Sequence, residues 1–158
     1  MSAYDTAKNV ALLAPVPLEH LMDGAPVVKT QGRVAFGSRA WEVFRELDAL
    51  RAGQSVDVYI YASRSDDSQL EASWHGRYIG HVESVGGAHP AGMKYRPPST
   101  QKSPADNVGH WAIFWELDTL HELAPTERLR VSDFTGFGKR KQYGIGFVPE
   151  GPLLVEHP

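Results

Sequence analysis

Arg39 and residues 136–141 carry the side chains whose types and spacing best suit the binding of an anion. Arg39 falls in the first turn of a predicted helix, where the helix dipole slightly disfavours a cation, so helix stability does not explain it. The segment Gly136-Phe137-Gly138-Lys139-Arg140-Lys141 places glycines beside three positive charges, a composition suited to phosphate contacts. A solvated hairpin turn is the competing interpretation of this segment.

Other kinds of site chemistry are not indicated. The chain has seven histidines and no cysteine, which excludes disulfides and thiol catalysis. The histidines show no metal-ligand spacing, and neither a Gly-x-Ser-x-Gly elbow nor a dinucleotide or P-loop fingerprint is present. We therefore predict no metal site, no cofactor and, in the leading interpretation, no catalytic residue.

The composition predicts one domain, residues 1–158, of the α+β class. A chain of 158 residues can bury one core, and its 15 glycines and 11 prolines indicate short strands, turns and few helices. The formal net charge is −3, so a nucleic acid would have to be contacted through a local patch. No basic leader and no membrane-length apolar run are present, and we expect a cytoplasmic protein without a membrane partner.

The elements around Arg39 include the helix that should position it. Ser38 is the predicted N-cap of this helix, whose apolar residues keep helical spacing up to Gly53. Upstream, residues 10–14 predict a strand closed by prolines, residues 18–23 a short helix ended by Gly24, and residues 27–35 a second strand.

Downstream of this helix the apolar period changes from that of a helix to that of a strand. In residues 56–63, Val56, Val58, Ile60 and Ala62 share one face, and Asp57, Tyr59, Tyr61 and Ser63 share the other. Further strands are predicted over residues 72–85, 111–117, 129–131 and 143–148, with a long loop over residues 86–109. The sum is a small mixed, barrel-like sheet of about five to seven strands, flanked by two or three helices.

Five short motifs follow one another in a particular order. They are the helix opening Phe36-Gly37-Ser38-Arg39-Ala40-Trp41, the strand end Tyr59-Ile60-Tyr61-Ala62-Ser63, the strand Gly80-His81-Val82-Glu83-Ser84-Val85, the loop Tyr95-Arg96-Pro97 and the strand Trp111-Ala112-Ile113. In this order, over residues 10–133, they resemble the EVE family of the PUA-like superfamily. The resemblance implies a single PUA-like domain.

The resemblance also implies a non-enzymatic protein that binds DNA or RNA and accepts a flipped, modified nucleobase between its sheet and its helix. A base that has left its stack needs aromatic faces and a few polar partners for its edge. The implied pocket residues are Ser38, Arg39, Trp41, Tyr61, Ser63 and Tyr95, with Trp41 and Tyr61 as the aromatic faces. The predicted contacts with the nucleic-acid backbone are Arg64, Arg96, Lys139, Arg140 and Lys141.

Several of these residues also have a purely structural interpretation. Capping alone explains Ser38, and both Trp41 and Tyr61 could pack instead of stacking on a base. Trp111 and Trp115 share a strand face with other apolar residues and are predicted to be core.

The chain departs from the EVE pattern at three places. Ala14-Pro15-Val16-Pro17 stands where the family usually has a serine-glutamate-proline element. Ala62 replaces the histidine of Tyr-His-Ser, and Ala40-Trp41 replaces asparagine-tyrosine. These differences leave the identity of the ligand open.

Two other functions compete with base recognition. A small hydrolase of the ASCH type, also PUA-like, would act on acylated or modified nucleosides, and Gly24, Lys29 and Arg33 are similar to its glycine-lysine-arginine arrangement. Lys29 would then be catalytic, but residues 30–32 lack the acidic residue expected between lysine and arginine. A protein-interaction module with a degenerate pocket is the third possibility.

Overall fold

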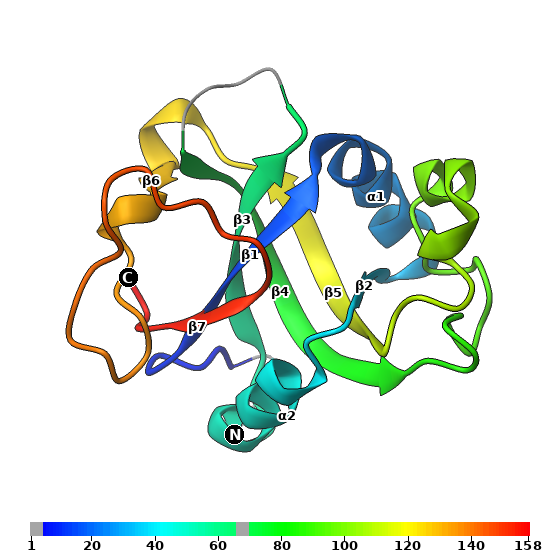
Figure 1. Cartoon of the computed structure of the whole chain (residues 1–158), viewed down its shortest axis with the longest axis horizontal. Coiled ribbons are helices and arrows are strands. Elements are labelled where there is room, and N and C mark those ends of the chain that lie inside the picture. The colour runs from blue at the N-terminus through cyan, green and yellow to red at the C-terminus, as the bar shows by residue number, and fades with distance from the viewer. Residues whose placement is uncertain (1–4, 66–69) are drawn as a thin grey trace.

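One curved sheet organises the computed structural model, which describes residues 5–65 and 70–158 (Figure 1). Within these residues there are two α-helices and seven strands: β1 (Ala11–Pro17), α1 (Leu18–Gln31), β2 (Val34–Ser38), α2 (Trp41–Arg51), β3 (Val56–Ser63), β4 (Glu71–Glu83), β5 (Ile113–Glu122), β6 (Leu129–Arg130) and β7 (Leu153–Val155). Short 3-10 helices occur at Pro98–Lys102, Pro104–Asp106, Pro125–Glu127 and Val131–Asp133. The predicted α+β class with a mixed sheet is confirmed.

The sheet is open. Its strands lie in the order β2-β5-β4-β3-β1-β7, and β6 pairs with β4 outside this path. β1 is parallel to β3, and the remaining pairs of the described strands are antiparallel. The predicted barrel-like closure is corrected, because β2 and β7, the two ends of this order, do not pair with each other.

Two prolines explain why one edge of β1 stays open. Residues 12–17 of β1 pair with β3, whereas only residues 11–13 pair with β7. Pro15 and Pro17 stand in the half of β1 that has a strand on one side only. Proline has no N–H to donate, so it is tolerated at such an edge and prevents further pairing. β1 therefore continues through Pro15, where it was predicted to close, and ends at Pro17.

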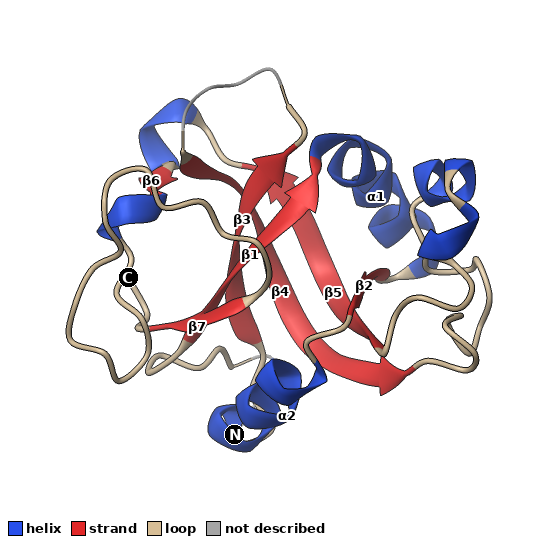
Figure 2. Cartoon of the chain, in the orientation of Figure 1, coloured by secondary structure: helices blue, strands red, loops and turns tan. Residues whose placement is uncertain are grey.

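The two faces of the sheet pack against different parts of the chain (Figure 2). On one face, Leu21 of α1 and Phe44 of α2 join Val58 and other sheet residues in the larger core. On the other face, segments near the C-terminus, including Phe134, pack with Tyr59 in a smaller cluster. The alternation in β3 thus separates two cores, and its aliphatic residues are buried as predicted.

α1 is longer than predicted and contains much of the segment expected to be the second strand. It continues through Gly24 and Pro26, so a helix end at Gly24 and a strand beginning at Val27 are both wrong. Gly24 is buried inside the helix, and a Cβ atom there would make ordinary van der Waals contact, at 3.4 Å from Val34 and 3.5 Å from Pro97. The glycine therefore faces neighbouring elements within α1, although local sequence rules assign it to a helix end.

Three further predictions are corrected by the backbone. Ser38 ends β2 and does not cap α2, whose N-cap is Ala40; the Ser38 hydroxyl accepts the Ala40 N–H at 3.0 Å. Residues 143–148 form no strand, because Tyr143 and Phe147 stack on each other and cover the smaller cluster without pairing. The strand expected from residue 111 begins at Ile113.

Candidate ligand pocket

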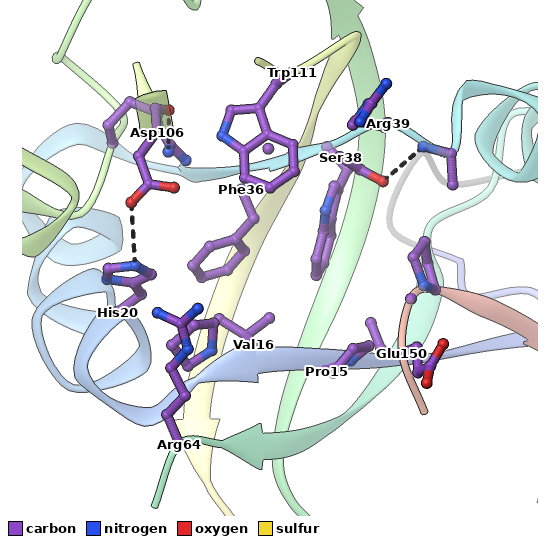
Figure 3. Close-up of a pocket in the computed structure, with 18 residues that line it drawn as sticks. Pro15, Val16, His20, Phe36, Ser38, Arg39, Arg64, Asp106, Trp111 and Glu150 are labelled. Carbon is purple, nitrogen blue, oxygen red and sulfur yellow. Dashed lines mark hydrogen bonds and ion pairs between the residues drawn. The ribbon is translucent and has the colours of Figure 1, made fainter. Parts of the chain in front are cut away.

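A pocket of about 410 Å³ lies between β1 and the end of β2, where the sheet is open (Figure 3). Val16, Phe36 and Trp115 form the part that is continuous with the larger core. The other walls come from the start of α1, the Pro104–Asp106 turn, the segment before β5 and residues 150–152. Sites for small molecules have volumes of about 300–1,000 Å³, so the pocket has the size of a binding site.

Trp111 forms an aromatic wall of this pocket. Its ring lies directly against Gly37: a Cβ atom at position 37 would stand 2.3 Å from Trp111 Cδ1. The indole Nε1 is buried and has no hydrogen-bond partner among the described residues. Leaving such a buried donor unpaired costs about 1–3 kcal/mol. Trp111 is therefore half-buried in a pocket wall and not core as predicted, whereas Trp115 is core.

One end of the pocket is polar. His20 in the first turn of α1 directs Nε2 toward Asp106, at 3.8 Å from Oδ2 (Figure 3). Its other ring nitrogen, Nδ1, lies 2.7 Å from Ser99 Oγ, and that hydroxyl donates to Asp23 Oδ1 at 2.8 Å. Burial lowers the pKa of His20, and Arg96 acts in the same direction against the opposing effect of Asp106. The imidazole is therefore neutral at pH 7.

Arg96 holds this polar end against β2. Its guanidinium donates to the carbonyl oxygens of Ala35 at 2.7 Å and Asp106 at 2.9 Å, and to Asn107 Oδ1 at 2.9 Å. It also lies over the Phe114 ring, 4.9 Å from the centroid. Burial lowers the pKa of Arg96 to about 10, so the side chain stays charged at neutral pH. Its contacts fix the backbone on both sides of the pocket.

Two exposed arginines stand at the pocket. Figure 3 shows Arg64 extending into it from the side of β1, and Arg39 on the other side at the end of β2. Glu150 supplies a negative charge on the same lining. Guanidinium groups suit bidentate contacts with phosphate, so Arg39 and Arg64 give the pocket a local charge that the whole chain lacks.

The structure brings together four of the residues predicted to contact nucleic acid. Ser38, Arg39, Arg64 and Arg96 all line this pocket. Ser38 is buried, and Arg96 has the structural contacts described above. Arg39 and Arg64 are therefore the predicted residues whose exposed side chains are placed to meet a ligand.

Other predicted pocket residues lie outside the lining. Tyr61 packs in the smaller cluster, on the opposite face of β3. Ser63 ends β3 opposite Pro17 without reaching the pocket. The Tyr95 ring packs under Arg33, whose Cζ is 5.5 Å from its centroid.

Trp41 lies on a second cavity of about 470 Å³, with Arg45, His81 and Glu83 among its lining residues. Its side chain is 44% exposed, and Arg45 lies 6.0 Å from its ring centroid. The turn at the end of β2 separates this cavity from the pocket. Trp41 and Tyr61 therefore do not form the two walls of one base site.

The remaining predicted cations are also distant from the pocket lining. Lys139, Arg140 and Lys141 are exposed in a turn closed by a bridge between Thr135 and Gln142, on the β7 side of the sheet (Figure 1). Lys29, the alternative catalytic residue, is exposed on α1 and does not stand on a strand.

His20 and Asp106 are pocket residues that the sequence interpretation missed. His20 follows a proline in a predicted helix start, and Asp106 lies in a polar loop, so neither position shows a pattern of its own. The weak signal for Trp111 was its position between a long loop and a strand.

A buried ionic network supports the loop that carries Tyr95 and Arg96. Glu116 is 5% exposed and accepts hydrogen bonds from His89 Nε2 at 2.9 Å and Arg33 Nη1 at 3.1 Å. Burial raises the pKa of Glu116, but these two partners outweigh burial and hold the pKa below its usual value. The folded protein therefore favours the charged carboxylate.

Acid is expected to destabilise the protein through Glu116. As the pH falls, the Glu116 carboxylate takes up its proton at a higher pH in the unfolded chain than in the folded one. The stabilisation from charged Glu116 is therefore complete above the ordinary glutamate pKa of 4.5 and is lost as the pH falls through the folded-state pKa. Urea unfolding between about pH 7 and pH 3 should show a shallower loss of stability for Glu116→Gln than for wild type. Glu46→Gln, exposed on α2, should follow wild type; parallel curves for Glu116→Gln and wild type would contradict the assignment.

Comparisons with models of protein families, with curated proteins and with solved structures find no match to this chain. The EVE resemblance therefore stays a prediction. Within residues 5–65 and 70–158, no group of three or more His, Asp or Glu side chains is arranged to hold a metal ion. No helix in these described segments has both the length and the apolar character needed to cross a membrane.

Proposed function

We propose that this protein is a non-enzymatic nucleic-acid-binding module that holds one unstacked nucleobase, modified in its natural target, in the pocket between β1 and β2. The proposal keeps the function implied by the EVE resemblance and changes the residues that carry it. Trp111 replaces Trp41 and Tyr61 as the aromatic surface, and the polar partners are His20 and Asp106.

The observation that carries the proposal is an aromatic wall and a polar end in one pocket of suitable size. An unstacked base restacks on an aromatic ring and presents donors and acceptors along its edge. Trp111 offers the ring, and His20 and Asp106 offer polar groups for the edge on the same pocket lining (Figure 3). Two segments of the resemblance, the Phe36-to-Ala40 turn and Trp111, meet at this place.

The local charge supports a polyanionic ligand. Arg39 and Arg64 lie on opposite sides of the pocket, so a chain that inserts one base has cations near the flanking phosphates. Phosphate contacts position a nucleic acid, whereas contacts with the base give specificity.

A hydrolase is less well supported. Lys29 lies outside the pocket lining. Ser99, His20 and Asp23 are the residue types of a nucleophilic triad. Their hydrogen bonds have the opposite direction to those of a triad. Ser99 donates its proton to Asp23, so His20 Nδ1 must donate to Ser99 and has no lone pair there to accept the serine proton.

Trp111→Ala is expected to weaken binding of short oligonucleotides about 10- to 100-fold, since stacking of a base on an aromatic side chain contributes about 1–3 kcal/mol. Affinities are measured by fluorescence anisotropy for single strands and duplexes with one central 5-methylcytosine, 5-hydroxymethylcytosine, N6-methyladenine or the plain counterpart. The wild type should bind at least one modified strand more tightly than its plain counterpart.

Trp41→Ala is the matched control, because it removes an exposed tryptophan outside this pocket. It should leave the preference for the test base unchanged. Negligible wild-type affinity for every strand would reject the proposed function. Loss of the preference in Trp41→Ala but not in Trp111→Ala would place the site at the second cavity.

A further inference from the structure

The hydrogen bonds around His20 decide which of its ring nitrogens carries the proton. Asp23 can only accept, so the hydroxyl hydrogen of Ser99 points to Asp23 Oδ1, and Ser99 Oγ must accept from His20 Nδ1. With burial keeping the imidazole neutral, Nε2 carries a lone pair and no proton. His20 therefore presents an acceptor to the pocket.

Asp106 places a second acceptor beside the first. Its carboxylate oxygen Oδ2 is 3.8 Å from His20 Nε2, and among the described residues no lysine, arginine or other histidine lies within ion-pair distance of this carboxylate. Two acceptors cannot hydrogen-bond to each other, and 3.8 Å is too long for a direct bond in any case. A donor group with two hydrogens can satisfy both acceptors at once.

We infer that the polar end of the pocket selects nucleobases with an exocyclic amino group, whose two N–H bonds are divided between His20 Nε2 and Asp106 Oδ2. This inference rests on the proposed function. Adenine, cytosine and guanine carry such a group, whereas uracil, thymine and hypoxanthine present a carbonyl oxygen or no group there. A carbonyl oxygen would leave both acceptors unpaired and would be repelled by the carboxylate.

The test compares bases that differ in this group. Single strands of thymidine carry one central guanine or hypoxanthine, adenine or purine, or 5-methylcytosine or thymine. The first two pairs differ only by the amino group. Wild type is expected to bind the amino-bearing member of each pair that binds measurably about 10- to 100-fold more tightly, the range for a hydrogen bond to a charged group.

Asp106→Leu removes both carboxylate oxygens at similar size and leaves His20 Nε2 as a single neutral acceptor, so each preference should fall well below the wild-type value, to about 2- to 10-fold. Asp106→Ala serves the same purpose if the leucine variant does not fold, and circular dichroism checks both. Equal wild-type affinity within every pair, or preference for hypoxanthine and thymine, would overturn the inference while leaving the proposed function intact. An undiminished wild-type preference in both Asp106 variants would also overturn it. Absence of binding to every strand, modified strands included, would overturn the proposed function and this inference with it.

Discussion

Gly37→Ala is expected to abolish specific oligonucleotide binding while lowering the stability of the domain only moderately. A Cβ atom at position 37 would lie 2.3 Å from Trp111 Cδ1 and 2.5 Å from Nε1, closer than atoms of two side chains can approach. The indole must therefore move. Gly37 lies in β2, and its φ is not in the left-handed region, so the backbone itself accepts alanine. The damage is confined to the aromatic wall.

The size of the two effects follows from where Trp111 can go. Overpacking a well-packed site costs about 1–3 kcal/mol, which lowers but does not abolish folding. A displaced indole no longer forms a flat wall next to Phe36 and the Asp106 end, so the pocket loses both stacking and alignment of the base edge. We expect affinity for the preferred oligonucleotide to fall by more than about 100-fold, beyond the loss in Trp111→Ala, because the displaced ring also obstructs the pocket.

Anisotropy titrations and urea unfolding of the same preparations separate the two effects. Gly144→Ala is the matched control, since position 144 is exposed, has no atom within 4 Å of an added Cβ and does not have a positive φ. It should match wild type in both measurements. Unchanged affinity in Gly37→Ala at an unchanged unfolding midpoint would show that the Trp111 wall does not contact the base.

Helices and strands whose apolar residues repeat with one clear period were predictable from sequence. In β3 the alternation of Val58 and Ile60 with two tyrosines reports burial directly, because successive strand residues face opposite sides. In α2 the spacing of Phe44 and Leu47 places both in the core, and the helix forms close to where it was predicted. These features depend on neighbours within a few residues.

The parts that were missed depend on contacts between distant segments. Gly24 is a packing position where α1 meets β2, although its local context is typical of a helix end. The tautomer of His20 is set by Ser99, 79 residues away. Trp111 becomes a pocket wall because Gly37 lacks a side chain, and neither residue carries that information alone. Trp41 and Tyr61 do not share a pocket, because Tyr61 packs in the smaller cluster on the opposite face of β3 and Trp41 lines the second cavity.

Arg96→Met is expected to cost about 3–5 kcal/mol of unfolding free energy, the largest effect on stability that we predict for a single substitution. The buried carbonyl oxygen of Ala35, the carbonyl oxygen of Asp106 and the Asn107 side chain would each lose a donor at 2.7–2.9 Å. Methionine fills part of the space but replaces none of these bonds. Arg96→Lys keeps the charge and can reach one acceptor at a time, so its loss should be intermediate.

Urea unfolding measures these losses, with Arg130→Met as the matched control: the Arg130 side chain is 76% exposed, and its removal should change stability by less than about 0.5 kcal/mol. The same variants distinguish the structural role of Arg96 from the phosphate contact predicted from sequence. If Arg96 contacted phosphate, Arg96→Met would make the salt dependence of oligonucleotide binding shallower and leave stability near wild type. Because the Arg96 donors hold β2 to the Asp106 turn, we expect the opposite: a large loss of stability, and a salt dependence that Arg39→Ala and Arg64→Ala make shallower but that the folded fraction of Arg96→Met keeps.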